Sequence, residues 1–118
     1  MTASMTGFKA GDVIWVAFPH VESERSTVRP ALVVSEKMVG PNDGLLWAMM
    51  VTNALRPDWP GDLPIEHYAS LGLPHPSKIR TAKIATLDAS GAEIISRIDD
   101  ELLAEVRGVM AANLGRPD

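Results

Sequence analysis

Short stretches of apolar, β-branched and aromatic residues recur along most of the chain, with turn-forming residues between them. The run VIWVAF at residues 13–18 is followed by Pro19 and is typical of a buried strand. The pattern predicts strands at residues 13–18, 31–34, 45–52, 63–67, 78–87 and 93–98. Glycine and proline clusters predict loops at residues 40–44, 53–64 and 71–76.

The spacing of apolar residues changes near the C-terminus and predicts a helix over residues 99–114. Acidic residues at its start suit the positive end of the helix dipole, and Asp99 is placed to cap it. Five or six short strands and one closing helix indicate a mainly β fold, a small antiparallel barrel or strongly bent sheet with the helix packed on it. We expect a single domain over residues 1–118, with residues 1–9 as a flexible N-terminus.

The amino-acid composition excludes several classes of protein and of functional site. The chain is 46% hydrophobic and 22% charged, as in ordinary globular domains. It has no cysteine, which excludes a disulfide scaffold, a cysteine nucleophile and a cysteine-bound metal. No apolar run approaches the roughly 20 residues of a membrane span. The absence of cysteine is compatible with a reducing cytoplasm, and we expect a cytoplasmic protein without a membrane partner. The sequence shows no metal-ligand spacing.

The net charge of −4 argues mildly against non-specific binding of long nucleic acids. The acidic excess is concentrated at the end of the chain, however, because residues 91–118 hold six acids and three bases. Residues 1–90 hold nine acids and eight bases and are close to neutral. A local basic surface is therefore compatible with the sequence.

A polar, charged segment at residues 20–28 separates the first two predicted strands and is interpreted as an exposed, mobile loop. It contains His20 and Arg25. Arg29 and Pro30 follow it and open the second predicted strand, where a proline is tolerated because no ladder donor is needed.

Four segments together carry a family resemblance. They are GDVIWV at residues 11–16, RPALVVS at 29–35, VT at 51–52 and PSKIRTAKI at 76–84. In this order and spacing the chain resembles the MazF/PemK family of toxins from bacterial toxin–antitoxin pairs, over about residues 10–113. The resemblance implies an SH3-like barrel with a C-terminal helix, and a metal-independent, homodimeric endoribonuclease that needs no cofactor and cleaves single-stranded RNA.

The chemistry of such an enzyme can be stated from first principles. The 2′-hydroxyl of RNA, which DNA lacks, can attack the adjacent phosphorus. Negative charge then grows on the phosphate oxygens, and cations or strong donors must meet it. A proton must leave the 2′-hydroxyl and another must reach the 5′ oxygen. The products would be a 2′,3′-cyclic phosphate and a 5′-hydroxyl.

The resemblance assigns catalytic roles to two residues. Arg29 matches the family's active-site arginine, and its fork of donors suits a phosphate. Without the family, Arg29 is better interpreted as a surface residue paired with Glu22 or Glu24. Thr52 matches the active-site threonine, and its hydroxyl can donate to a phosphate oxygen. The alternative for Thr52 is a β-branched residue that ends a strand.

Histidine is the side chain that titrates nearest neutral pH, so the three histidines are candidates for proton transfer. His20 ranks first because it stands at the entrance of the polar loop, and His75 and His67 rank below it. Each histidine taken alone is more often a plain surface residue. At residues 75–78 the chain reads HPSK, where some family members have arginine and aspartate.

Four further residues are candidates for binding substrate. Arg25 would steer RNA from the loop, and Ser77 and Arg80 would contact it. A strand residue paired with Asp88 is the alternative for Arg80. Trp59 could stack an unpaired base or contact an antitoxin, and packing within its own loop is equally compatible with the sequence.

The predicted partners are single-stranded RNA, a cognate antitoxin and a second copy of the chain, with DNA bound only through the toxin–antitoxin complex. An antitoxin with a disordered acidic and apolar tail could cover the RNA site. The alternative function is a non-catalytic SH3-like module that binds a peptide or protein, which the negative net charge favours slightly.

Overall fold

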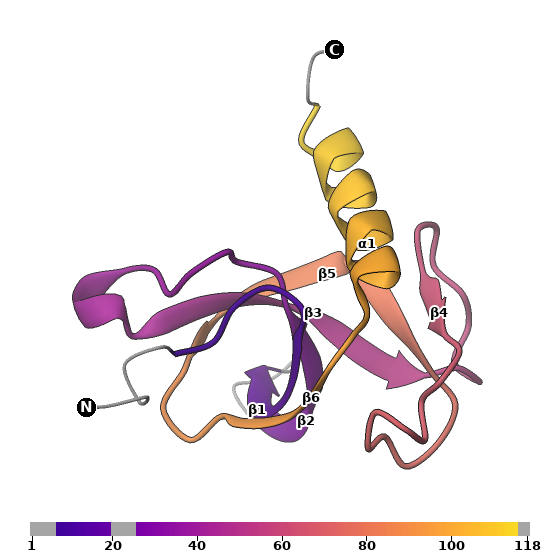
Figure 1. Ribbon diagram of the computed structural model, residues 1–118, viewed down its shortest axis with the longest axis horizontal. Coiled ribbons are helices and arrows are strands. Elements are labelled where there is room, and N and C mark those ends of the chain that lie inside the picture. Colours follow the sequence, from indigo (N-terminus) through magenta and orange to yellow (C-terminus); the bar gives the residue numbers. More distant parts are fainter. Residues whose placement is uncertain (1–6, 20–25, 116–118) are drawn as a thin grey trace.

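The computed structural model describes residues 7–19 and 26–115. Six antiparallel strands form one curled sheet, in the order β4-β5-β3-β2-β1-β6, and a single long helix stands against it (Figure 1). The strands are β1 (Asp12–Pro19), β2 (Ser26–Val33), β3 (Leu45–Asn53), β4 (Leu63–Ile65), β5 (Ser77–Asp88) and β6 (Glu93–Arg97). A short 3-10 helix spans Pro41–Asp43, and the long helix α1 spans Asp100–Asn113. The predicted mainly β class is confirmed.

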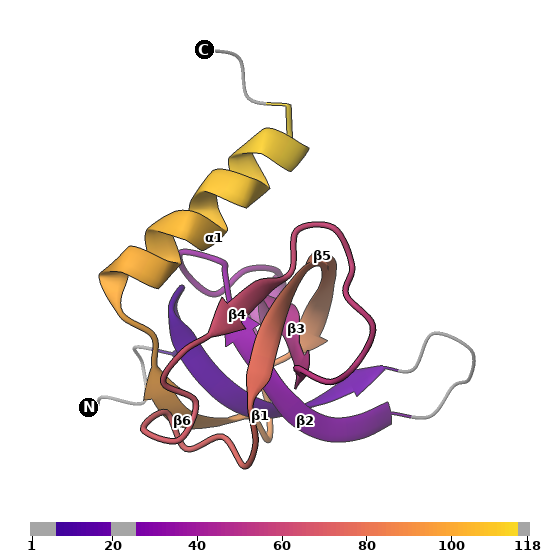
Figure 2. The same cartoon turned by 90° about the vertical axis from the view of Figure 1, so that its right-hand side faces the viewer.

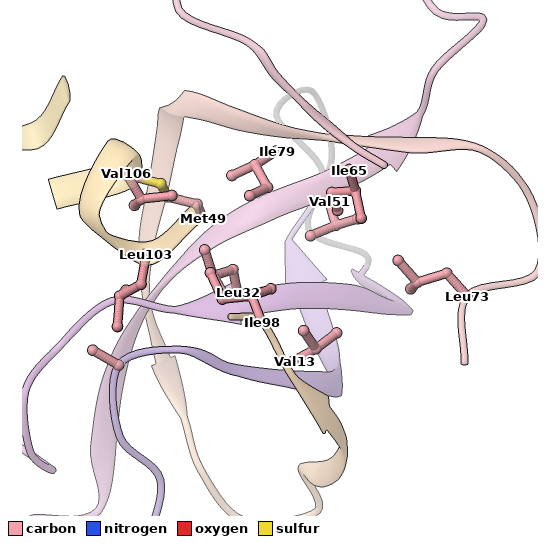
Figure 3. Close-up of a cluster of buried hydrophobic side chains, with 11 residues drawn as sticks. Val13, Leu32, Met49, Val51, Ile65, Leu73, Ile79, Ile98, Leu103 and Val106 are labelled. Atoms are coloured by element: carbon pink, nitrogen blue, oxygen red, sulfur yellow. The ribbon is translucent and has the colours of Figure 1, made fainter. Parts of the chain in front are cut away.

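The sheet buries apolar side chains on both faces, which explains the unbroken apolar run in β1. On one face Val13, Leu32 and Met49 join a core that Leu103 and Val106 of α1 cover (Figure 3). Ile14 belongs to a second core, on the other face of the sheet. Because neighbouring residues of a strand point to opposite faces, a strand buried on both sides shows no polar alternation.

An irregularity in β5 bends the sheet where the two halves of the strand meet different neighbours. Met49 pairs with Ile84, but the next residue, Met50, pairs with Arg80, so residues 81–83 are extra on β5. Such an insertion kinks a strand and increases its local twist. The first half of β5 also pairs with β4, which closes that edge of the curl.

Helix α1 begins where the sequence indicates. The carboxylate of Asp99 accepts a hydrogen bond of 2.8 Å from the backbone N–H of Leu102, a typical N-cap. Arg107 donates to Glu36 at 2.7 Å and ties the helix to the segment after β2. The C-terminal turns extend beyond the sheet (Figures 1 and 2). No helix in the described part of the chain is long and apolar enough to cross a bilayer.

The second strand is longer than predicted. It begins at Ser26, so part of the segment interpreted as a mobile loop is strand, and Pro30 lies within β2 rather than at its start. The polar residue Thr27 pairs with Phe18 of β1 in an arm that reaches away from α1 (Figure 2). A two-stranded arm does not need apolar residues at every second position, which is why the hydrophobic pattern missed this part of the strand. Residues 20–25 lie outside the described part of the chain.

Candidate active site

Strands β2 and β3 separate at one end, and this opening places two of the predicted residues together. The last pair of their ladder is Ala31 with Met50. Pro30 has no backbone N–H, so it cannot donate to a continued ladder. Extending the register by two residues sets Arg29 opposite Thr52. The two side chains that the family resemblance singles out therefore flank the same gap between neighbouring strands.

A cavity of about 290 Å³ occupies this opening. Its apolar lining residues are Trp15, Val28, Pro30, Val51 and Pro74. Its polar lining residues are Arg29, Thr52, Asn53, Arg56, His75 and Ser77. A concave, largely apolar site with a few convergent polar groups is the usual form of a ligand site. None of these lining residues is acidic, although the chain as a whole carries a net charge of −4.

The hydroxyl of Thr52 has no hydrogen-bond partner among the described residues, although Thr52 is only 8% exposed. Burying a hydroxyl without a partner costs free energy, and buried polar groups in proteins are as a rule satisfied. A ligand oxygen or water in the cavity would satisfy it. Thr52 is therefore better explained as a binding group than as a residue that merely ends a strand.

Two guanidinium groups, those of Arg29 and Arg56, face this cavity without a carboxylate partner in the described part of the chain. The recorded side-chain neighbour of Arg29 is the thioether of Met50, with Nη1 4.0 Å from Sδ. Such a sulfur is a weak acceptor and does not neutralise the charge. Glu22 and Glu24, the alternative partners of Arg29, lie outside the described residues.

The loop that carries Arg56 is fixed to β5 by buried ion pairs. Lys78 donates to the backbone oxygen of Arg56 at 2.6 Å and to Asp58 Oδ1 at 2.7 Å. Arg80 lies 2.9 Å from Asp62 Oδ2, and Lys78 lies 3.6 Å from the same oxygen. The side chains of Lys78, Arg80 and Asp62 are 5%, 9% and 6% exposed. Asp62 thus stands between two buried cations.

This environment lowers the pKa of the Asp62 carboxyl. Burial is the largest single effect and acts in the opposite direction, because it favours the neutral acid. Hydrogen bonds from Arg80 and from the backbone N–H of Trp59 favour the carboxylate, and so do the charges of Arg80 and Lys78. Together they outweigh the effect of burial.

Arg80 and Trp59 contact each other, which the sequence analysis did not predict. The guanidinium of Arg80 lies 4.3 Å from the centre of the Trp59 ring and pairs with Asp62 rather than with Asp88. Neither residue lines the cavity. The Trp59 ring packs against Arg80 and stays 42% exposed, so its assigned roles in stacking a base or contacting an antitoxin stay predictions. The pair supports the loop that presents Arg56.

A further cation, Lys83, lies in the extra segment of β5 with its Nζ 5.9 Å from the centre of the Phe18 ring. Its pKa is lowered by burial first, and then by the charges of Arg29 and Arg80. Among the described residues neither Lys83 nor Arg29 forms an ion pair with a carboxylate, and neighbouring cations that are not neutralised create a field that attracts anions. Lys83 therefore adds to the positive potential around Arg29.

The remaining predicted residues divide into two groups. Ser77 lines the cavity, but its hydroxyl donates to the backbone oxygen of His75 at 2.7 Å, so it also holds the neighbouring segment. His75 lies on the cavity wall, whereas His67 lines a different cavity beside α1. His20 and Arg25 fall outside the described residues. Their assigned roles stay predictions.

Comparison with known proteins identifies the family. The model of the PemK-like, MazF-like toxins of type II toxin–antitoxin systems matches residues 9–114. The chain belongs to this family. The membership that the sequence motifs indicated is thereby confirmed, and with it the assignment as a toxin of a type II toxin–antitoxin system.

Solved structures of MazF proteins share the fold. The MazE–MazF complex of Deinococcus radiodurans (Form-II) is 26% identical, with a TM-score of 0.73, over 94% of this chain and 98% of that one. MazF from the same organism (Form-I) is 27% identical, with a TM-score of 0.71, over 92% and 97%. A mycobacterial endoribonuclease in complex with its cognate antitoxin is 15% identical over 94% and 99%, with a TM-score of 0.69, and shows the fold alone. None of the curated proteins compared matches the sequence.

The MazF-like site contains two polar residues that sequence reasoning did not single out, Asn53 and Arg56. Asn53 directly follows Thr52, and Arg56 is the first basic residue after β3. Both residues lie at or just after the end of β3, and this closeness to Thr52 is the feature of the sequence that could have identified them. Within the described residues, no group of three or more His, Asp or Glu side chains is arranged to hold a metal ion.

Proposed function

We propose that this MazF/PemK-family toxin is an endoribonuclease that cleaves single-stranded RNA through the 2′-hydroxyl, without a metal ion. One observation supports it above all others. The cavity between β2 and β3 is lined by two guanidinium groups and by a buried hydroxyl that has no partner among the described residues, and none of the described lining residues is a carboxylate. Such a site suits a phosphodiester, because its arginines can pair with the negative charge. The rest of the protein carries a net negative charge and repels an acidic ligand more strongly.

The proposed reaction is an attack of the 2′ oxygen on the adjacent phosphorus. As the new P–O2′ bond forms, negative charge grows on the two non-bridging oxygens. Arg29 donates to these oxygens and stabilises the charge, and Thr52 donates a further hydrogen bond that positions the phosphate. Donors that are fixed before the reaction stabilise the transition state most, because they need no reorganisation. The P–O5′ bond then breaks and leaves a 2′,3′-cyclic phosphate and a 5′-hydroxyl.

Arg56 and Asn53 extend the site beyond the scissile phosphate. Arg56 would hold a neighbouring phosphate, because the ion pairs beneath its loop keep it at the cavity rim. Asn53 presents an amide that can donate to and accept from a base edge. Two cationic contacts along one backbone favour a chain of nucleotides over a mononucleotide, which supports a polymeric substrate.

The proposed partners follow from the same surface. The Form-II structure from Deinococcus radiodurans is a MazE–MazF complex, and the mycobacterial endoribonuclease is bound to its cognate antitoxin. We propose that this chain likewise has a cognate antitoxin. An acidic antitoxin segment would compete with RNA for Arg29 and Arg56. We also propose that the toxin acts in the cytoplasm as a homodimer and meets DNA only through the antitoxin. Val28, which is 63% exposed at the cavity rim, is an apolar group that a second copy would cover.

The function is tested by incubating the purified chain with a long RNA in EDTA and mapping both ends at each cut. We expect cleavage at a restricted set of sites, with 2′,3′-cyclic phosphate ends and 5′-hydroxyl ends that polynucleotide kinase labels without prior dephosphorylation. The matching single-stranded DNA is expected to stay intact. No cleavage of RNA, 5′-phosphate ends, or equal cleavage of DNA would each overturn the proposal.

A further inference from the structure

His75 is held at the wall of the cavity by its neighbours in the chain. Leu73, two residues before it, is 4% exposed and anchors the segment in the core beneath α1. Pro74 and Pro76 flank His75, and proline restricts its own backbone and that of the residue before it. The hydroxyl of Ser77 donates to the His75 carbonyl at 2.7 Å. The backbone of His75 is therefore held at the cavity wall, where its side chain is exposed.

The segment is also tied to the strand that carries Thr52. The backbone N–H of Ala54 donates to the Pro76 oxygen at 2.9 Å, just beyond the end of β3. The Nδ1 atom of His75 lies 3.5 Å from that same oxygen. The tautomer with a proton on Nδ1 makes this long contact as a donor and leaves a lone pair on Nε2. That tautomer is suited to accept a proton.

The charged groups that face His75 are cations. Arg29 from β2 and Arg56 from the loop after β3 line the cavity with it, and no described lining residue is a carboxylate. Lys78 of β5 is turned toward Asp58 and Asp62. His75 is the one histidine among the described lining residues, and the free ring nitrogen of an imidazole can accept a proton.

We propose that His75 is the general base of the cleavage reaction. Its Nε2 accepts the proton of the 2′-hydroxyl while the O2′–P bond forms. The P–O5′ bond breaks, the 5′ oxygen takes a proton from solvent, and His75 returns its proton to solvent. This inference rests on the proposed ribonuclease function. It does not depend on His20, the first choice from sequence, which lies outside the described residues.

The test compares wild type with His75→Gln and His75→Ala, and uses His67→Gln as the matched control. His67 is a histidine of the same loop region, has a side chain that is 76% exposed, and lines another cavity. We expect His75→Gln to lower kcat by about 10²- to 10³-fold, since a positioned acid or base contributes about this much. KM and the thermal midpoint should stay near their wild-type values, and His67→Gln should behave as wild type.

Two readouts separate proton transfer from a structural role. In the wild type kcat should fall toward acidic pH, and this fall should be absent from His75→Gln. Added imidazole should restore part of the activity of His75→Ala. A His75→Gln enzyme with the wild-type rate and pH profile would overturn the inference and leave the ribonuclease proposal standing. A wild-type chain that does not cleave RNA would overturn both.

Discussion

Replacing Arg29 with alanine is expected to lower kcat/KM for RNA cleavage by about 10²- to 10³-fold, the usual loss when one donor to a developing oxyanion is removed. Arg29 stands opposite Thr52 at the open end of the β2–β3 ladder and has no carboxylate partner among the described residues. Its removal should therefore cost transition-state stabilisation without breaking an observed ion pair. The measurement is the initial rate of cleavage of an oligonucleotide that contains one mapped site.

Two variants make the result specific to the guanidinium at this position. Arg29→Lys keeps the charge but not the planar fork, so an intermediate rate is expected. Arg107→Ala removes a guanidinium from the exposed face of α1, where it pairs with the exposed Glu36. It should change kcat/KM by no more than about twofold, as is usual for surface positions. Equal losses in Arg29→Ala and Arg107→Ala would show a general effect of charge and contradict the role given to Arg29.

Replacing Asp62 with alanine is expected to destabilise the fold by about 3–5 kcal/mol, because it leaves buried cations without their shared carboxylate. Lys78 and Arg80 both reach Asp62, and all three side chains are less than a tenth exposed. Asp58→Ala is the matched control. It removes the other carboxylate on Lys78, at 2.7 Å, but that side chain is 86% exposed, so a loss of about 0–1 kcal/mol is expected. Urea unfolding of the three proteins measures both values.

The pH dependence of unfolding gives a second readout of the same cluster. Despite burial, which raises it, the pKa of the Asp62 carboxyl is held below its ordinary value of 3.8 by Arg80, the backbone N–H of Trp59 and Lys78. Its stabilising contribution is therefore complete above that value and is lost as the pH falls through the lower, folded pKa. Below about pH 4 the difference in unfolding free energy between wild type and Asp62→Ala should shrink. A difference that stays constant through this range, or equal losses for Asp58→Ala and Asp62→Ala at neutral pH, would contradict the ion-pair role.

The positions of the strands and of the helix along the chain could be predicted, because they depend on local patterns in the sequence. Apolar runs between turn residues located the strands, and Asp99 before an amphipathic segment located the helix cap. The start of β2 was missed because Thr27 and Val28, in the arm where β2 pairs with β1, are both exposed. Hydrophobic periodicity reports burial, and a strand that pairs through its backbone while its side chains face water carries little of that signal.

The site was predictable only where the family motif fixed a residue. Arg29 and Thr52 meet the same cavity because each lies two residues beyond the last pair of the β2–β3 ladder, Ala31 with Met50. Arg80 was a candidate for contacting RNA, with an ion pair to Asp88 as the alternative. Its partner Asp62 lies 18 residues earlier, and the choice among several acids depends on how the intervening loop folds. Sequence shows which charges exist, but only the tertiary structure shows which of them are already neutralised.

Cleavage of an RNA oligonucleotide with a single 2′-deoxy nucleotide on the 5′ side of the mapped scissile phosphate tests the central claim most directly. The deoxy oligonucleotide lacks the nucleophile but keeps the phosphates that Arg29 and Arg56 would bind. We predict that it is not cut at this site and that it inhibits cleavage of the all-RNA oligonucleotide with a Ki close to the KM of that substrate. Cleavage of the deoxy oligonucleotide at the wild-type rate would contradict attack by the 2′ oxygen and the mechanism built on Arg29 and Thr52.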